Sequence, residues 1–510
     1  MSGLRLASAI LFLASVTYGA APRLDALLPP GWQVGKTNTI TALGSISAWP
    51  AQLWCNHPGI KFTPQKSKGK FTVSIGSDVP PGPYLVRLHS KDGASDAKFF
   101  VAGALPEISE SEDNGTMSSA AAITNLPVVV NGRLGKSGDT DFFKVSLQRG
   151  QTISAALDGY RLRSLIDPFI RLHDPRGYEV ALASDTHTID PFLHYRAKET
   201  GDHWLQVFAI AHKASTTVSF VGASASVYRL TITTDGTTTP GEPIRADVNE
   251  KREKDKVQVV KAPTAVAGTL GKAGEVDRYQ FAAKKGDQFI VRVDSHKLGY
   301  PMDPVMVINR PGGRLLRETD DTKPYRDPEY LVKATAGDYT VEIRDRFLRG
   351  GKDFRYRLVI EKPAPSVVVT ADKEIIALEA GKTADLKLKF ARKNSHKGKM
   401  TIVLNDLPKG VGIKDEKIDE KAKDATVKLV AAADAPAHSG PVRILVRDEV
   451  TEVPTIRKAH RTFITGDSRG DYLLNETEWF WVTVKPAPPK KKEEKKEPAK
   501  KESAKKETKK

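Results

Sequence analysis

Residues 132–150 read GRLGKSGDTDFFKVSLQRG, and residues 268–286 read GTLGKAGEVDRYQFAAKKG. The two stretches match at a constant offset of 136 residues (268 minus 132), with glycines, a Leu-Gly-Lys run and an aspartate at the same places. The same offset places Asp167-Pro168 on Asp303-Pro304 and Gly201-Asp202 on Gly337-Asp338. A match this regular indicates an internal duplication.

Within each copy the hydrophobic residues alternate with polar ones. In residues 141–147, Phe143, Val145 and Leu147 fall on one face of an extended chain, and the same pattern recurs in residues 169–172 and 203–207. Glycine and Asp-Pro turns interrupt the pattern every ~8 to 15 residues, with no helical period between them. This spacing predicts two antiparallel β-sandwiches of half-buried strands, in which the turn glycines supply positive φ.

The first copy resembles a known family. The run Glu110-x-Glu112-x-Asn114, then residues 138–143, Asp167-Pro168 and residues 201–204, are similar to the bacterial pre-peptidase C-terminal domain. The resemblance implies a jelly-roll-like β-sandwich, appended to secreted peptidases and other exported proteins, whose members bind collagen or other polymers with Ca²⁺ stabilisation. It covers residues 106–234 well, whereas the second copy has Glu250-Lys251-Arg252-Glu253 in place of the Glu-x-Glu-x-Asn run.

The chain of 510 residues is long enough for three or four domains at about 150 residues each. Its single cysteine, Cys55, leaves no intrachain disulfide, so each domain depends on its own core; we interpret Cys55 as a small buried hydrophobe. Residues 22–103 resemble an IPT/TIG immunoglobulin-like module, and residues 365–486 resemble immunoglobulin-like modules found beside carbohydrate-active enzymes. We therefore predict an all-β protein of four β-sandwiches in series: residues 22–103, 106–234, 256–361 and 365–486, after a signal peptide (1–20) and before a disordered tail (487–510).

The first twenty residues predict export. Arg5 supplies a basic start, residues 6–16 are uncharged and apolar, and small residues precede a cleavage point near Gly19 or Ala20. No later stretch approaches the ~20 consecutive apolar residues of a spanning helix. We expect a secreted or periplasmic protein, in some settings attached to the cell surface.

The formal charge of +17 is concentrated in the tail. Residues 490–510 hold eleven lysines and five glutamates, which leaves +11 over the preceding 489 residues. So diffuse an excess does not favour a nucleic-acid partner. The tail has two interpretations of equal weight, a segment that binds an anionic polymer or membrane surface and a solubilising spacer diluted by its glutamates.

One group of oxygen-bearing residues predicts a metal site, namely Glu110, Glu112, Asn114, Asp139 and Asp141. Calcium takes six to eight oxygen ligands, and a chain that wraps around the ion could bring these side chains together. The alternative is a solvated acidic linker. In the second copy Lys251 and Arg252 replace the first ligands beside Glu275 and Asp277, so we expect Ca²⁺, as a structural ion, in the first copy only.

No motif predicts catalysis. Residues 466–470 (GDSRG) differ from a trypsin-like motif at Arg469 and are interpreted as a turn, as is the integrin-type tripeptide 469–471. Five histidines, at positions 173, 187, 194, 203 and 212, lack the spacing of a zinc site. No glycine-rich loop has the context of a nucleotide-binding site.

These observations predict an exported, non-catalytic protein that binds or displays extracellular polysaccharide, protein or envelope components. The alternative is a non-catalytic targeting subunit of a secreted peptidase or other hydrolase. A hydrolase built on scattered His and Asp residues carries the least weight, because a catalytic site requires convergent groups.

Overall fold

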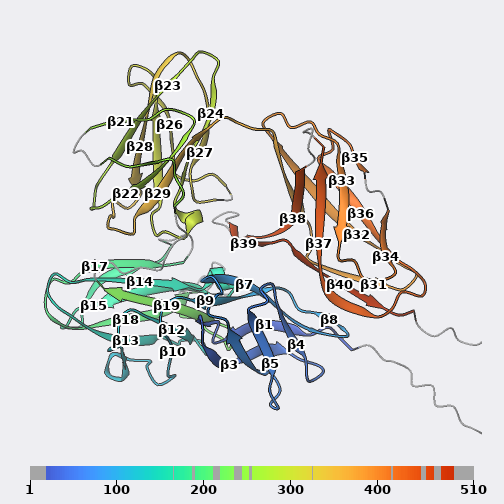
Figure 1. The fold of residues 1–510 in the computed structure, drawn as a ribbon. Coiled ribbons are helices and arrows are strands. Elements are labelled where there is room, and N and C mark those ends of the chain that lie inside the picture. The colour runs from blue at the N-terminus through green and yellow to red at the C-terminus, as the bar shows by residue number, and fades with distance from the viewer. Residues whose placement is uncertain are drawn as a thin grey trace, which may run out of the picture.

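The computed structural model describes residues 19–164, 166–185, 190–210, 219–234, 244–251, 256–323, 325–414, 417–449, 455–464 and 473–487. Within these residues the regular structure consists of β-strands and short 3-10 helices, arranged as four sandwiches (Figure 1). The predicted all-β architecture of sandwich modules is confirmed. We number the sandwiches modules 1 to 4 along the chain.

Module 1 is formed by two sheets, β1-β3-β6-β5 and β2-β9-β7-β4, with β8 paired to β7. Its strands are β1 (Arg23–Leu28), β2 (Gly31–Gln33), β3 (Thr37–Ser45), β4 (Gln52–Cys55), β5 (Ile60–Pro64), β6 (Lys70–Ile75), β7 (Gly82–Ser90), β8 (Gly93–Ala94) and β9 (Lys98–Gly103). Alternate residues such as Phe71 and Val73 are fully buried between the sheets. Cys55 packs half-buried against this core, and burial raises the pKa of its thiol to about 12.

Module 2, the first copy, pairs the sheets β10-β12-β19-β14-β17 and β11-β13-β18-β15-β16. Its elements are β10 (Glu107–Ser109), η1 (Met117–Ser119), β11 (Ala121–Ala122), β12 (Val128–Arg133), β13 (Asp141–Leu147), β14 (Thr152–Asp158), η2 (Tyr160–Leu162), β15 (Asp167–His173), β16 (Glu179–Ala183), β17 (Phe192–Arg196), β18 (Gly201–Ile210) and β19 (Val227–Thr234). Phe143, Val145 and Leu147 are buried in its core, as their alternation predicts.

Module 3, the second copy, repeats this topology with the sheets β20-β22-β29-β24-β27 and β21-β23-β28-β25-β26. Its elements are β20 (Val248–Asn249), β21 (Gln258–Val259), β22 (Thr264–Thr269), β23 (Asp277–Ala283), β24 (Gln288–Asp294), η3 (His296–Leu298), β25 (Pro304–Asn309), β26 (Leu315–Thr319), β27 (Glu329–Lys333), β28 (Gly337–Asp345) and β29 (Arg355–Glu361). The pairs β10·β12 and β20·β22 are both parallel, whereas the long strands pair antiparallel.

Module 4 is a sandwich whose strands hydrogen-bond in the order β31-β40-β37-β38-β30-β32-β36-β34, with β33, β35 and β39 paired at its sides. The strands are β30 (Ser366–Ala371), β31 (Ile375–Glu379), β32 (Thr383–Lys393), β33 (Met400–Asn405), β34 (Val411–Lys414), β35 (Lys417–Ile418), β36 (Asp424–Ala431), β37 (His438–Asp448), β38 (Thr455–Ile464), β39 (Leu473–Thr477) and β40 (Trp479–Lys485). Leu386, Leu388 and Phe390 of β32 face the core, as predicted from their alternation with charged residues.

The modules pack on one another rather than forming an extended row. Modules 1 and 2 lie side by side, and modules 3 and 4 stand on them (Figure 1). Arg87 of β7 is 0% exposed and donates from Nη2 to Glu374 Oε2 of module 4 at 2.8 Å. Beside this pair, the ring of Trp54 lies 5.5 Å from Trp479 and 5.8 Å from Trp481, measured between centroids. The first and last modules therefore share a buried interface.

Candidate carboxylate sites in the two copies

The predicted ligands of the first copy surround the start of β13. Glu110 follows β10, where its backbone N–H donates to Asn131 O at 3.0 Å. Its Oε1 accepts from the backbone N–H of Arg133 at 2.5 Å, and its Oε2 lies 2.6 Å from the hydroxyl of Tyr228. Asp141 Oδ2 lies 2.6 Å from the same hydroxyl, so Glu110 and Asp141 converge on one tyrosine.

The convergence on Tyr228 has a chemical consequence. A phenol has one proton, so it can donate to only one of two carboxylates at a time. The second 2.6 Å contact is attractive only if the other carboxyl is protonated and donates to the tyrosine oxygen, or if a cation lies between the carboxylates. Burial, and then the charge of Asp141, raise the pKa of Glu110 to about 9. Burial likewise raises the pKa of Asp141 to about 6.

Asn114 joins this pair. Its side chain is 1% exposed, and its amide lies 3.0 Å from both Asp141 Oδ1 and the carbonyl oxygen of Ser111. With the amide nitrogen toward them, Asn114 donates to both oxygens. With the amide oxygen toward them, three oxygens meet without a proton, an arrangement that requires a cation.

The remaining two predicted ligands are engaged elsewhere. Glu112 Oε1 pairs with Arg133 Nε at 2.7 Å, and Asp139 Oδ2 accepts from the backbone N–H of Gly135 at 2.6 Å. The structure therefore brings together Glu110, Asn114 and Asp141, and holds Glu112 and Asp139 at the rim.

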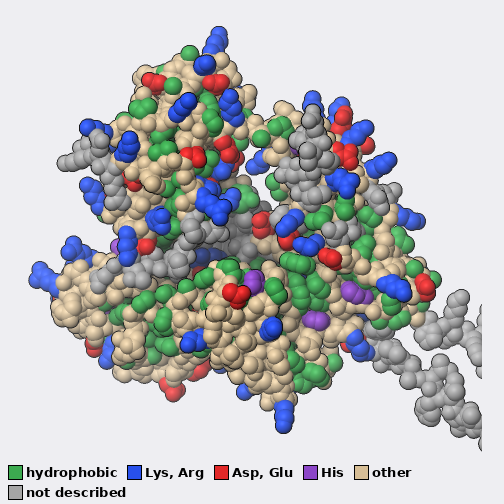
Figure 2. All heavy atoms as spheres, viewed as in Figure 1, with side chains coloured by type: hydrophobic (Ala, Val, Ile, Leu, Met, Phe, Trp, Pro, Cys, Tyr) green, Lys and Arg blue, Asp and Glu red, His purple; other side chains and the backbone are tan. Residues whose placement is uncertain are grey.

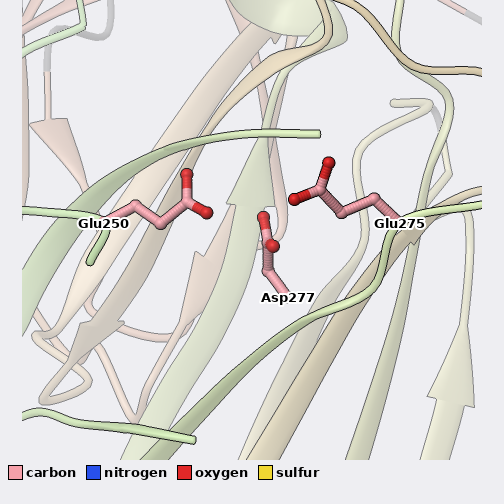
Figure 3. Close-up of side chains that lie close together, drawn as sticks. All are labelled: Glu250, Glu275 and Asp277. Atoms are coloured by element: carbon pink, nitrogen blue, oxygen red, sulfur yellow. The ribbon is translucent and has the colours of Figure 1, made fainter. Parts of the chain in front are cut away.

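The second copy contains a tighter acidic group. Glu250, Glu275 and Asp277 each offer a carboxylate oxygen, and these oxygens lie within 4.8 Å of one another (Figure 3). A second oxygen on each is held by a donor: Glu250 Oε2 by Thr269 N and Glu275 Oε2 by Lys272 N, both at 2.9 Å, and Asp277 Oδ2 by the hydroxyl of Tyr356 at 2.6 Å. Burial raises the pKa of Asp277 to about 7, and the charges of Glu250 and Glu275 add to this increase.

The assignment of Lys251 to the place of the first ligand is therefore wrong. The backbone N–H of Glu250 donates to Ala267 O at 2.8 Å, which is the bond that Glu110 makes with Asn131 in the first copy. The equivalent of Glu110 is thus Glu250, at an offset of 140 residues (250 minus 110) instead of 136. A four-residue difference before β22 hides this equivalence from a comparison at constant offset. Arg252 lies outside the described residues.

The tyrosines differ between the copies in a way that affects the carboxylates. The hydroxyls of Tyr279 and Tyr356 lie 2.6 Å apart, so Tyr279 can donate to Tyr356, which donates to Asp277. Phe143 takes the place of Tyr279 in the first copy, at the 136-residue offset. Tyr228 therefore lacks this neighbour and is shared by two carboxyl groups instead. The notebook-level motif search had no reason to select these tyrosines, because they lie in closing strands far along the chain.

A second buried carboxylate in each copy also escaped the motif analysis. Asp190 accepts from the backbone N–H groups of Gly159, Tyr160 and Arg161, at the start of η2. Asp327 does the same for residues 295–297, at the start of η3. Burial raises the pKa of Asp190 to about 6 and that of Asp327 to about 7. These carboxylates hold the 3-10 turns in place.

The described histidines are occupied separately. His173 lies within 3.4 Å of Gln206 Oε1, His194 within 2.9 Å of Ser154 Oγ, and His203 within 3.1 Å of Gly201 O. His187, His212 and the motifs in residues 466–471 lie outside the described residues, as do the predicted signal segment up to residue 18 and the tail from residue 488. Within the described part, the acidic triad of the second copy is the group of three or more metal-ligating side chains that converge.

Comparisons with known proteins add solved structures of similar architecture. No family model and no curated protein matches the chain. The pre-peptidase C-terminal domain of a Bacillus anthracis collagenase is 13% identical, covering 22% of this chain and 100% of that one at a TM-score of 0.18. Fibronectin(III)-like modules of Clostridium thermocellum CbhA are 13% identical, covering 41% and 90% at a TM-score of 0.14. The D00-D0 domain of intimin is 13% identical, covering 37% and 92% at a TM-score of 0.17.

The fold and the sites define the class to which the chain belongs. It is an all-β, multi-domain protein of sandwich modules, two of them duplicates with a carboxylate group where the chain leads into the sandwich. The described residues contain no helix long and apolar enough to cross a membrane.

Proposed function

We propose that the protein is an exported, non-catalytic binding or surface-display protein that recognises an extracellular polysaccharide, protein or envelope component. The observation that carries the proposal is the buried contact between modules 1 and 4. Because Arg87 and Glu374 are 0% and 9% exposed in their side chains, this contact holds the first and last sandwiches in one arrangement. Loops and sheet faces of several modules then form a composite surface, which suits recognition of an extended partner.

The buried charged groups support this proposal through the roles that they fill. Asp190 and Asp327 hold turns, Glu374 joins modules, and Glu107 pairs with Arg229 inside module 2. On the face seen in Figure 2, Lys and Arg side chains are spread over the modules with acidic side chains among them. A partner recognised by shape and hydrogen bonds fits such a surface better than one held by charge alone.

The experiment is a pull-down of the mature chain against insoluble polysaccharides, collagen-like protein and envelope fractions, with parallel assays for peptide, ester and glycoside hydrolysis. We expect retention on at least one polymer and no turnover. Turnover that Ser468→Ala abolishes would overturn the proposal. Retention that requires an added peptidase would favour the alternative, a targeting subunit of a secreted hydrolase.

We also propose Ca²⁺ as a structural ion. The donor set fits, because Glu110, Asp141 and Asn114 supply hard oxygen ligands that otherwise need a proton or a rotated amide. The sequence-based reason for excluding the second copy was the substitution by Lys251, which the register of Glu250 removes. The proposal therefore extends to Glu250, Glu275 and Asp277. At each site the bound ion would neutralise the carboxylates and tie the incoming segment to the sandwich.

A further inference from the structure

A cavity of about 210 Å³ lies where modules 1, 2 and 3 meet. Its floor is the outer face of the module 2 sheet β10-β12-β19-β14-β17. Module 1 covers it with residues 81–83 and 101–103, and module 3 closes it with Gly299 and Pro301. The cavity is therefore created by the assembly of three sandwiches.

The strand register places the floor residues in two rows. Thr231 of β19 is opposite Val129 on one side and Ala156 on the other, and Ala156 is opposite Phe192. In the next row Arg229 is opposite Asn131 and Asp158. Small or apolar side chains thus form one row, and hydrogen-bonding groups form the row beside it.

The second copy shows what opens the cavity. At the same register Arg292 occupies the place of Ala156, and Val359 occupies the place of Thr231. The Arg–Asp pair itself is kept, since Arg357 Nη2 donates to Asp294 Oδ2 at 2.6 Å. Arg292 also pairs with Asp294 and covers the same area of the sheet. The short side chain of Ala156 leaves this area free in module 2.

The polar wall is rigid and locally neutralised. Arg229 is 4% exposed and pairs with Glu107, while Arg161 pairs with Asp158 at 2.7 Å and Asp190 at 3.3 Å. A side chain at Gly31 would bring its Cβ within 2.6 Å of Arg229 Nε, so glycine makes room for this guanidinium. Because carboxylates already match both arginines, an anionic ligand would gain little, whereas hydroxyl groups could hydrogen-bond at the margins of the pairs.

We propose that this cavity binds one neutral six-membered sugar ring, such as a hexose unit at the end of a polysaccharide. The inference rests on the proposed function as a polymer-binding protein and names the ligand class. A cavity of about 150 Å³ holds benzene, so about 210 Å³ admits one ring with its hydroxyl groups. Phe192 supplies an apolar surface for the ring face, and Thr231, Asp158 and the arginines supply partners for the hydroxyls.

The test uses the mature chain and ligand-observed NMR titrations with glucose, galactose and N-acetylglucosamine. Glucuronate serves as an anionic ring and cyclohexanol as an apolar ring. We expect at least one neutral hexose to bind more tightly than both comparison rings. Stronger binding of glucuronate or cyclohexanol, or no binding of any neutral hexose, overturns the inference.

Two substitutions locate the site. Ala156→Arg reproduces the second copy, can pair with Asp158, and should lower hexose affinity at least tenfold. Thr231→Val removes one hydroxyl without changing the shape and should lower affinity about fivefold, the equivalent of ~1 kcal/mol for one hydrogen bond. The matched control Val359→Thr, in module 3, should leave affinity unchanged. Circular dichroism and melting temperature verify the fold of each variant, and Thr231→Val keeps the test decisive if Ala156→Arg unfolds.

The same variants separate this inference from the proposed function. If the native chain is retained on a polysaccharide and both variants of module 2 are retained equally, the cavity is not the site, although polymer binding stands. If hexoses bind and both variants lose them, yet no polymer or envelope fraction retains the native chain, the site stands and the proposed function fails.

Discussion

Removing Glu374 should destabilise the contact between modules 1 and 4 by about 3 kcal/mol, the lower end of the range for breaking a buried ion pair. In Glu374→Ala the guanidinium of Arg87 stays buried and loses its 2.8 Å contact with Glu374 Oε2. The backbone N–H of Ala97 also loses its acceptor at 3.3 Å. The lower end applies because Arg87 Nη1 still donates to Ser95 O at 3.0 Å, which retains part of its hydrogen bonding.

Urea titrations followed by tryptophan fluorescence measure this loss. Trp54 packs against Trp479 and Trp481, so separation of the two modules changes their environment. The first transition of Glu374→Ala should move to lower urea, and small-angle scattering should show an expanded particle there. Since a four-module chain is not expected to unfold in two states, only this first transition is compared.

Two further variants complete the test. Glu379→Ala removes an exposed glutamate of the same strand region and should change stability by less than about 0.5 kcal/mol. The double variant Arg87→Met, Glu374→Leu should regain most of the loss, because apolar residues of similar volume can replace a buried pair. If Glu374→Ala matches Glu379→Ala, the ion pair does not hold the modules together and the reasoning is refuted.

The remaining predictions concern pH, Ca²⁺ and the tail. Because folding raises the pKa of Asp277 to about 7, its contribution to stability is fully present below its unfolded pKa of ~4 and is lost as pH rises through 7; Asp277→Asn should flatten the melting temperature of module 3 over this window. Millimolar Ca²⁺ should raise melting temperatures at neutral pH by binding the folded state, with the effect reduced by Asp141→Asn in module 2 and by Asp277→Asn in module 3; no response in the native chain would contradict the ion site. Deleting residues 490–510 should leave the melting temperature unchanged and weaken binding to anionic vesicles only at low salt, whereas a large loss of stability would show that the tail packs on the modules.

The fold could be predicted from sequence because its signals are local. Alternation in residues 141–147 defines which face of a strand is buried, and glycines mark turns that need a left-handed backbone. Gly138 and its counterpart Gly274 have φ of +82° and +73°, so both adopt the conformation for which glycine was expected. The duplication then transfers the interpretation from one copy to the other.

The site could be predicted only in part, because its partners are distant along the chain. Tyr228 meets Glu110 from 118 residues away, and no local pattern marks either residue as the partner of the other. The equivalence of Glu250 with Glu110 was lost because the connecting segment differs in length, whereas strand register restores it. Arg87 and Glu374, 287 residues apart, could not be matched from composition or spacing.

The contact between the first and last modules also determines how the molecule would carry a mechanical load. A side chain built at Gly93 would place its Cβ 3.0 Å from Ala21 Cβ and 3.8 Å from Thr483 Oγ1, so both ends of the described chain lie at the same corner of the molecule. Tension applied between these ends would act first on the interface around Arg87, and modules 2 and 3 would stay unstrained until that interface opened. A partner bound at the three-module junction would then be shielded from a pull that the outer interface can bear.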